Sequence, residues 1–186
     1  MISTILLIIL AVVVLTLIFS ISKYNSLIRL SNLVKEGWSG IDIQLKRRYD
    51  LIPNLVQTVK GYAAHESGVL EKVVALRNKA MASTGIDEKS QLEPQLTQAL
   101  KTVFALSESY PDLKANESFI ELQKNLADVE NNIQLSRRYY NGVVREYDTS
   151  ISVFPGNMIA NFFGFQFKPY FELDSNEEGS NVKVEF

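Results

Sequence analysis

The chain has 186 residues, 46% of them hydrophobic, with a formal net charge of −2 and no cysteine. This length suits one domain plus an anchor, and the near-neutral charge gives no reason to expect nucleic acid or anionic lipid as a partner. The lack of cysteine excludes disulfides and thiolate metal sites.

Ile2 to Ile21 is an apolar run without a charged residue. As a helix it is about 30 Å long, which matches the hydrocarbon thickness of a bilayer. A cleaved signal peptide is the alternative, but it requires a basic N-terminal region and a shorter apolar run. We therefore predict a single-pass inner-membrane anchor over residues 1–22. Because Lys23, Arg29 and Lys35 follow the run, we expect the N-terminus outside and the rest in the cytoplasm.

The helical pattern continues past the anchor, with apolar residues at steps of three and four. The membrane helix is therefore expected to be continuous with a first bundle helix over about 23–51. Pro53 lacks an N–H and disfavours a helical residue before it, so this helix should end near Leu51. Gly37 and Gly40 flank Trp38, and they indicate either a close approach of another helix or a local weak point.

Three further helices are expected at about 53–82, 91–109 and 115–149. The first two are separated by the polar stretch 83–90, and Pro94 suits the first turn of the next helix. The last has the strictest spacing of apolar residues, which is typical of a core face or coiled-coil seam. Short links favour an all-α, antiparallel up-down four-helix bundle over residues 23–151.

Residues 152–171 form an aromatic segment that begins with a short helix ending at Gly164. Such an aromatic surface is not left in water, so it should cap the bundle, dock on a neighbouring subunit or lie on the membrane. The candidate interaction residues here are Phe162, Phe163, Phe165, Phe167 and Phe171.

Residues 172–186 are expected to be a flexible, acidic tail. Its last five residues alternate with a period of two. This pattern fits a disordered end, a short strand that pairs with a sheet edge, or a C-terminal ligand for another protein. Phe186 in this pattern is a further candidate interaction residue.

Charged residues concentrate at two places in the predicted bundle. One is the stretch 42–50, and the other is the part of the last helix that contains Glu130, Arg137 and Arg138. Lys46, Arg47 and Arg48 form the densest basic run, and Asp42 lies four residues before Lys46, as in a helical ion pair. These positions indicate either inter-helix ion pairs that fix register or a basic contact patch for a partner or phosphate, and nearby acidic residues favour ion pairs. The candidate structural polar residues are Asp42, Asp50, Glu130, Arg137 and Arg138.

No motif in the sequence predicts catalysis, a metal or a cofactor. His65 is the single histidine, and no HExxH, P-loop or G-x-G-x-x-G pattern is present. An exposed polar role is the expectation for His65.

Four stretches carry a family resemblance: WSGIDIQLKRRYDLIPNLVQTVKGY at 38–62, YPDLKANESFIELQ at 110–123, VENNIQLSRRYYNGVVREYD at 129–148 and FPGNMIANFFGF at 154–165. Together they resemble the LemA family of bacterial membrane proteins, in the family order. The resemblance implies one N-terminal membrane helix, an antiparallel helical bundle and no established enzymatic activity.

These observations predict a non-catalytic scaffold or adaptor that self-assembles at the membrane. The expected partners are the bilayer, through Ile2–Ile21, other copies of the chain, and a membrane protein. The alternative is an accessory subunit of a membrane enzyme such as a protease or an envelope-stress component, which the resemblance to LemA proteins suggests. An enzyme with an unrecognised site is a remote alternative.

Overall fold

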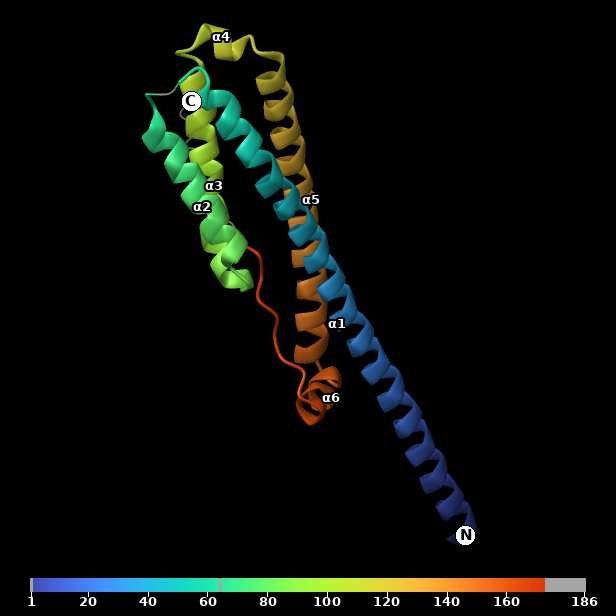
Figure 1. The fold of residues 1–186 in the computed structure, drawn as a ribbon. Helices are drawn as coiled ribbons and strands as arrows, with labels where there is room; N and C mark the ends of the chain where they lie inside the picture. Colours follow the sequence, from blue (N-terminus) through green and yellow to red (C-terminus); the bar gives the residue numbers. More distant parts are fainter. Residues whose placement is uncertain (1, 64, 173–186) are drawn as a thin grey trace, which may run out of the picture. The chain divides into compact units, whose positions relative to one another are not determined.

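The computed structural model describes residues 2–63 and 65–172, and within these ranges every regular element is a helix. The elements are α1 (Ile2–Lys60), α2 (Ser67–Ala82), α3 (Ile86–Ser107), α4 (Pro111–Lys114), α5 (Glu117–Ser152) and α6 (Gly156–Phe163), as Figure 1 shows. The all-α class predicted from the sequence is confirmed. Except for Glu172, the expected acidic tail and the terminal strand with Phe186 lie outside the described residues.

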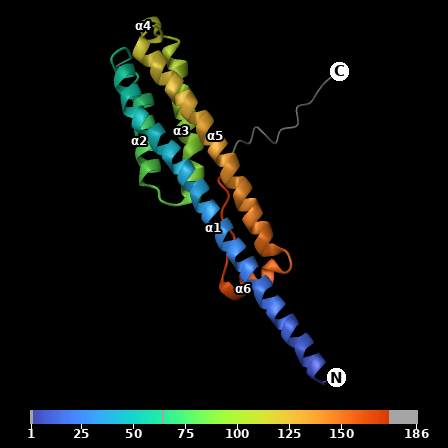
Figure 2. The ribbon, with the colours of Figure 1, turned by 90° about the vertical axis from the view of Figure 1, so that its right-hand side faces the viewer.

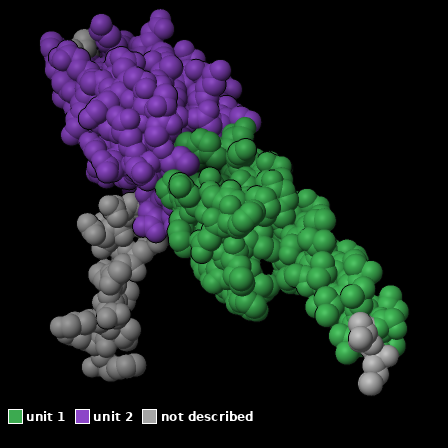
Figure 3. All heavy atoms as spheres, turned by 90° about the horizontal axis from the view of Figure 1, so that it is seen from below, with its two compact units in different colours: residues 1–39, 138–169 green, residues 40–137, 170–186 purple. Residues whose placement is uncertain are grey.

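The chain divides into two compact units, coloured green and purple in Figure 3. The first unit contains the residues up to Ser39 together with Arg138–Pro169, and the second contains Gly40–Arg137 and the residues from Tyr170. Helices α1 and α5 each contribute to both. The apolar N-terminal run and α6 therefore belong to the same unit.

In the first unit, the N-terminal part of α1 is long and apolar enough to cross a membrane. Its large side chains are exposed; Leu6, Leu10 and Leu15, for example, each have more than half of their surface accessible. The core helix of a soluble domain buries such residues, so their exposure favours lipid as the surroundings of this run. Within the described residues, this is the one candidate membrane-spanning helix.

In the second unit, the end of α1, α2, α3 and the start of α5 lie side by side in both Figures 1 and 2. Their apolar stripes meet in a core of fully buried side chains, among them Ile41, Leu45, Ile52, Leu55, Leu96 and Ile133. Burying one such side chain contributes about 1.5–3 kcal/mol. Asn116 caps α5, because its Oδ1 accepts a hydrogen bond from the Phe119 backbone N–H at 3.0 Å.

The predicted helix end near Leu51 is wrong, since α1 runs through Pro53 to Lys60. A proline inside a helix leaves the carbonyl four residues earlier without its N–H donor. Here that carbonyl belongs to Tyr49, and Arg77 Nε from α2 donates to it at 2.6 Å. A side chain thus replaces the missing backbone donor, and the helix continues.

The single helix expected over 53–82 is also wrong, because the chain turns between Lys60 and Ser67. Val59 before the turn, Ala63 within it, and Leu70 and Val73 after it are all buried. The apolar periodicity therefore passes through the break unchanged, and periodicity alone could not reveal it.

Helix α3 starts at Ile86, earlier than expected, so Pro94 lies inside it. Its first turn contains Asp87 and Glu88, whose negative charges favour a helix N-terminus. The sequence predicts a polar turn over 83–90, but these two residues instead begin the helix.

The start of α6 depends on a glycine. A Cβ added at Gly156 would lie 2.1 Å from the Ser150 carbonyl oxygen of α5, whereas one added at Gly142 would meet nothing within 4 Å. We expect Gly156→Ala to lower the free energy of unfolding of the first unit by about 1–3 kcal/mol through overpacking. Gly142→Ala is the matched control and should keep or raise stability, because alanine is the better helix former. Equal denaturation curves for the two variants would contradict this packing.

Candidate functional site

The most deeply buried charged residues of the second unit surround Arg48. Its side chain lies on α1 and is 4% exposed, and its Nη1 is 2.9 Å from Oε2 of Glu93 on α3. Its Nη2 donates to Thr97 Oγ1 at 3.0 Å and also contacts Glu130 Oε2 from α5. We call Arg48, Glu93, Thr97 and Glu130 the Arg48 network.

The Arg48 network joins three helices through one guanidinium group. Burying a charge costs several kcal/mol unless partners compensate it, and two carboxylates do so here. Arg48 Nε has no hydrogen-bond partner within the described residues, whereas both Nη atoms are engaged. Glu130 is 29% exposed and also accepts from Gln134, so the network reaches solvent at its edge.

Tyr49 extends the network beside Arg48. Its hydroxyl donates to Glu93 Oε1, so both oxygens of the fully buried Glu93 carboxylate are engaged. Burial raises the pKa of Tyr49 well above its usual value, and the neighbouring Glu93 carboxylate raises it further. The hydroxyl therefore remains a protonated donor at physiological pH. Both the Glu93 carboxylate and the Tyr49 hydroxyl are thus engaged in contacts that fix the position of the helices.

The predicted basic run does not form one patch. Lys46 and Arg47 are exposed, and Arg47 Nη1 donates to Gln44 at 3.3 Å, whereas Arg48 points into the bundle. The expected pair of Asp42 with Lys46 is wrong, because Asp42 Oδ1 is 2.7 Å from Lys89 Nζ of α3. Packing between helices places a lysine from another element closer.

The remaining structural polar candidates behave differently from one another. Glu130 binds Arg48 of another helix rather than an arginine of its own. Asp50 and Arg138 are exposed and Arg137 is half-buried, and within the described ranges none of the three forms an ion pair. His65 is exposed, as expected.

The sequence interpretation missed Glu93, Thr97 and Arg77. One signal was available for α3, because Lys89, Glu93 and Thr97 recur every four residues beside the buried Leu92 and Leu96. This spacing places a polar line along a buried helix face. No local signal marked Arg77, whose acceptor is 28 residues away.

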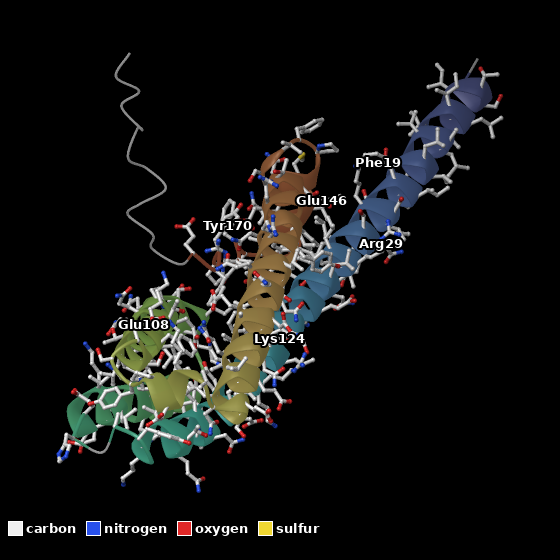
Figure 4. The ribbon with its side chains drawn as sticks, turned by 90° about the horizontal axis from the view of Figure 1, so that it is seen from above. Phe19, Arg29, Glu108, Lys124, Glu146 and Tyr170 are labelled. Atoms are coloured by element: carbon white, nitrogen blue, oxygen red, sulfur yellow. The ribbon has the colours of Figure 1, made fainter. Side chains whose placement is uncertain are left out.

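The first unit holds a second candidate site, an apolar groove of about 790 Å³. One wall comes from Thr16, Phe19 and Ser20 of α1; Figure 4 marks Phe19. The other wall comes from α6 and the residues before it, namely Phe154, Pro155, Met158, Ile159, Phe162 and Phe163. We call this the α6 groove. Its lining is almost entirely apolar, so it suits hydrocarbon rather than a charged ligand.

The predicted aromatic interaction residues divide into three groups. Phe162 and Phe167 are 82% and 68% exposed. Phe163 and Phe165 contact the Tyr24 ring of α1, with centroids 4.6 and 5.9 Å apart. Phe171 is fully buried and belongs to the second unit.

Three hydrogen bonds tie the residues after α6 to α5. Tyr140 OH donates to the Pro169 carbonyl at 2.7 Å, Tyr147 OH donates to the Gln166 carbonyl at 3.0 Å, and the Lys168 N–H donates to Asp148 Oδ1 at 3.2 Å. Burial raises the pKa of both Tyr147 and Asp148, and Lys168 partly offsets the shift at Asp148. These bonds fix where α6 lies in the first unit.

Gly37 supports the interpretation that a neighbouring helix approaches α1 closely. A Cβ added at Gly37 would lie 3.3 Å from the Tyr140 Cα of α5, whereas one added at Gly40 would meet nothing within 4 Å. Trp38 packs beside it, edge-on to Tyr140 with ring centroids 5.8 Å apart. Close approach thus explains Gly37 and not Gly40.

Adjacent arginines test whether the Arg48 network holds the bundle together. Arg48→Ala leaves the buried Glu93 carboxylate without its cation and should lower the free energy of unfolding by about 3–5 kcal/mol. Arg47→Ala, at an exposed neighbouring position, should change it by no more than about 0.5 kcal/mol. Chemical denaturation measures both, and equal effects would show that the network is not needed for stability.

Tyr49→Phe removes the hydroxyl that donates to Glu93 and should cost about 1–3 kcal/mol. Because the folded-state pKa of Tyr49 exceeds the unfolded value of 10.0, its contribution is present below pH 10 and lost as pH rises above it. Wild type should therefore lose more stability than Tyr49→Phe above pH 10. Tyr139→Phe, at a half-exposed position, is the control and should follow wild type. Parallel pH profiles for wild type and Tyr49→Phe would contradict the assignment.

Comparisons with known proteins place the chain among its relatives. The LemA family profile matches residues 37–186. Protein LemA of Metamycoplasma hominis is 25% identical over 142 residues, covering 75% of this chain and 64% of that protein. Magnetosome protein MamQ 2 of Paramagnetospirillum magneticum is 23% identical and covers 81% and 65%.

Magnetosome protein MamQ of Magnetospirillum gryphiswaldense is also 23% identical, covering 87% of this chain and 71% of that protein. The match spans less than two thirds of the length of the first two relatives, and none of the names states a catalytic activity. The family profile, however, covers most of the chain. The chain therefore belongs to the LemA family.

Proposed function

We propose that this protein is a non-catalytic scaffold or adaptor, anchored in the inner membrane by Ile2–Ile21, that self-assembles through its helical domain. The positive-inside distribution of Lys23, Arg29 and Lys35 supports an N-terminus outside and a domain in the cytoplasm. Family membership and the exposed apolar run of α1 support the membrane location.

The burial and hydrogen bonding of Glu93 support a structural role most strongly. An acid or base that works on a substrate must reach the reacting atom. Glu93 is fully buried, and its two oxygens are occupied by Arg48 and Tyr49 of the same bundle. Lys89 is likewise paired with Asp42. The charged chemistry inside the bundle thus serves to hold helices in register.

Two residues on the outer surface of α1 are exposed and accessible to a partner. Ile43 is 56% exposed, and Arg47, one turn later, is exposed too. Contact with a second copy of the chain would remove the Ile43 side chain from water. We propose this face as a contact between copies of the chain.

Photo-cross-linking in living cells tests the proposal. A photoreactive amino acid at Ile43 or Arg47 should give bands at multiples of the 21.0 kDa chain mass. The same substitution at Lys124, exposed on α5, is the control for random collision and should give much weaker bands. A variant without Ile2–Ile21 should lose the bands if anchoring concentrates the copies.

Mass spectrometry of the products separates the alternatives. A cross-link from Arg47 to a different membrane protein, with no multiples of the chain mass, would favour the accessory-subunit alternative. Absence of both kinds of product would contradict a scaffold or adaptor role.

A further inference from the structure

We propose that residues 153–167, which comprise α6 and its flanks, are a second membrane contact that dips into the same bilayer as the anchor. We call them the dipping segment. The inference rests on the proposed anchoring through Ile2–Ile21 and goes beyond it, because it gives the exposed aromatic surface a lipid partner.

The dipping segment has no charge to keep it in water. No Asp, Glu, Lys or Arg occurs from Thr149 to Phe167, and the next residue, Lys168, restores polarity at the end. A charge-free stretch that includes this many aromatic residues transfers favourably into the boundary between headgroups and acyl chains. Lys168 is suited to the headgroup level.

Helix α6 presents apolar side chains on the side away from the protein. Gly156 and Ala160 are buried and lie one turn apart on the packed side. Met158 and Phe162, also one turn apart, lie on the opposite side and are 64% and 82% exposed. A helix on the surface of a soluble domain shows the reverse pattern, with polar residues outward.

The α6 groove sets the depth of this helix. Its other wall is Thr16, Phe19 and Ser20, which belong to the last turns of the apolar run. When Ile2–Ile21 spans the hydrocarbon, α6 therefore lies beside the end of the span, near the interface. Two contacts within the first unit agree with an interfacial level. Lys23 Nζ lies 5.8 Å from the Phe19 ring centroid, and the Tyr24 ring contacts the Phe163 ring at a tilt of 51°.

Lipid fits this surface better than a second copy of the chain does. Beside the end of the anchor, lipid already offers an apolar surface, so association of two α6 faces gains less than it would in water. The exposed Phe162 and Met158 surface also continues directly from the exposed Phe19 of the anchor, both lining one groove. A single bilayer covers the two together.

The chain contains no cysteine, so one introduced thiol can report on one site. The full-length variant Phe162→Cys is labelled with an environment-sensitive fluorophore and reconstituted in phosphatidylcholine–phosphatidylglycerol vesicles. Separate vesicles carry lipids with a doxyl quencher near the headgroup or near the chain end. Leu10→Cys, in the apolar run, tests anchoring. Lys124→Cys, at an exposed position of the second unit, gives the emission of a label in water.

We expect the label at position 162 to emit at shorter wavelength than the one at position 124, and to lose most of its fluorescence to the shallow quencher. The deep quencher should act less on it, since an interfacial helix lies about 5–10 Å into the boundary. The label at position 10 should respond more to the deep quencher. Met158→Cys, one turn from Phe162, should repeat the result at position 162, and circular dichroism checks that each variant is helical.

Each other outcome overturns the inference in a recognisable way. A label at 162 that emits at short wavelength without lipid quenching is covered by protein, either this domain or a second copy. A label that emits as position 124 does is in water. If position 10 is not quenched either, the anchoring itself fails; if position 10 is quenched and 162 is not, anchoring stands and the second contact is refuted.

Discussion

A guanidinium group withdrawn from water must be met by anions, and this constraint shapes the bundle of the second unit. Arg48 is 3% exposed, and Glu93 and Glu130 reach it from two other helices. A one-turn slip of any of these helices, about 5.4 Å, would separate the charges and leave at least one buried without a partner. Apolar packing alone tolerates such slips more easily, so the network specifies one register.

The same region shows how side chains replace backbone bonds. Pro53 interrupts the hydrogen bonding of α1, and Arg77 restores it by donating to the Tyr49 carbonyl. Tyr49 thus takes part twice, since its hydroxyl binds Glu93. In the first unit, the hydroxyls of Tyr140 and Tyr147 serve a related purpose by fixing the residues after α6 to α5. Tyr49, Tyr140 and Tyr147 fit the apolar stripes of the sequence, yet each also makes a hydrogen bond to a distant segment.

Patterns of neighbouring residues predicted much of this structure. The errors arose where contacts between residues far apart in the sequence decide the outcome. The spacing of apolar residues predicted an all-α fold, and the glycine at 164, with φ of 74°, ends the short aromatic helix. The break between Lys60 and Ser67 was missed because the apolar periodicity is in phase on both sides. The continuation through Pro53 was missed because its cause, Arg77, lies on another helix.

The candidate sites followed the same rule. The sequence identified Arg48 and Glu130 as polar residues of the bundle but not their pairing, and it grouped Arg48 with the exposed Lys46 and Arg47. Composition located the aromatic segment, but which phenylalanines face outward depends on the packing of Gly156 against Ser150. Contacts between distant segments therefore determine which charged residues pair and which phenylalanines are exposed.

The proposed scaffold requires that anchored copies of this domain assemble with one another in a membrane. Native mass spectrometry of full-length protein in lipid nanodiscs, with discs in large excess, counts the copies in each disc. If the copies assemble, discs holding two or more copies should dominate among occupied discs. Occupied discs that hold one copy each, at the frequency expected from random loading, would contradict it.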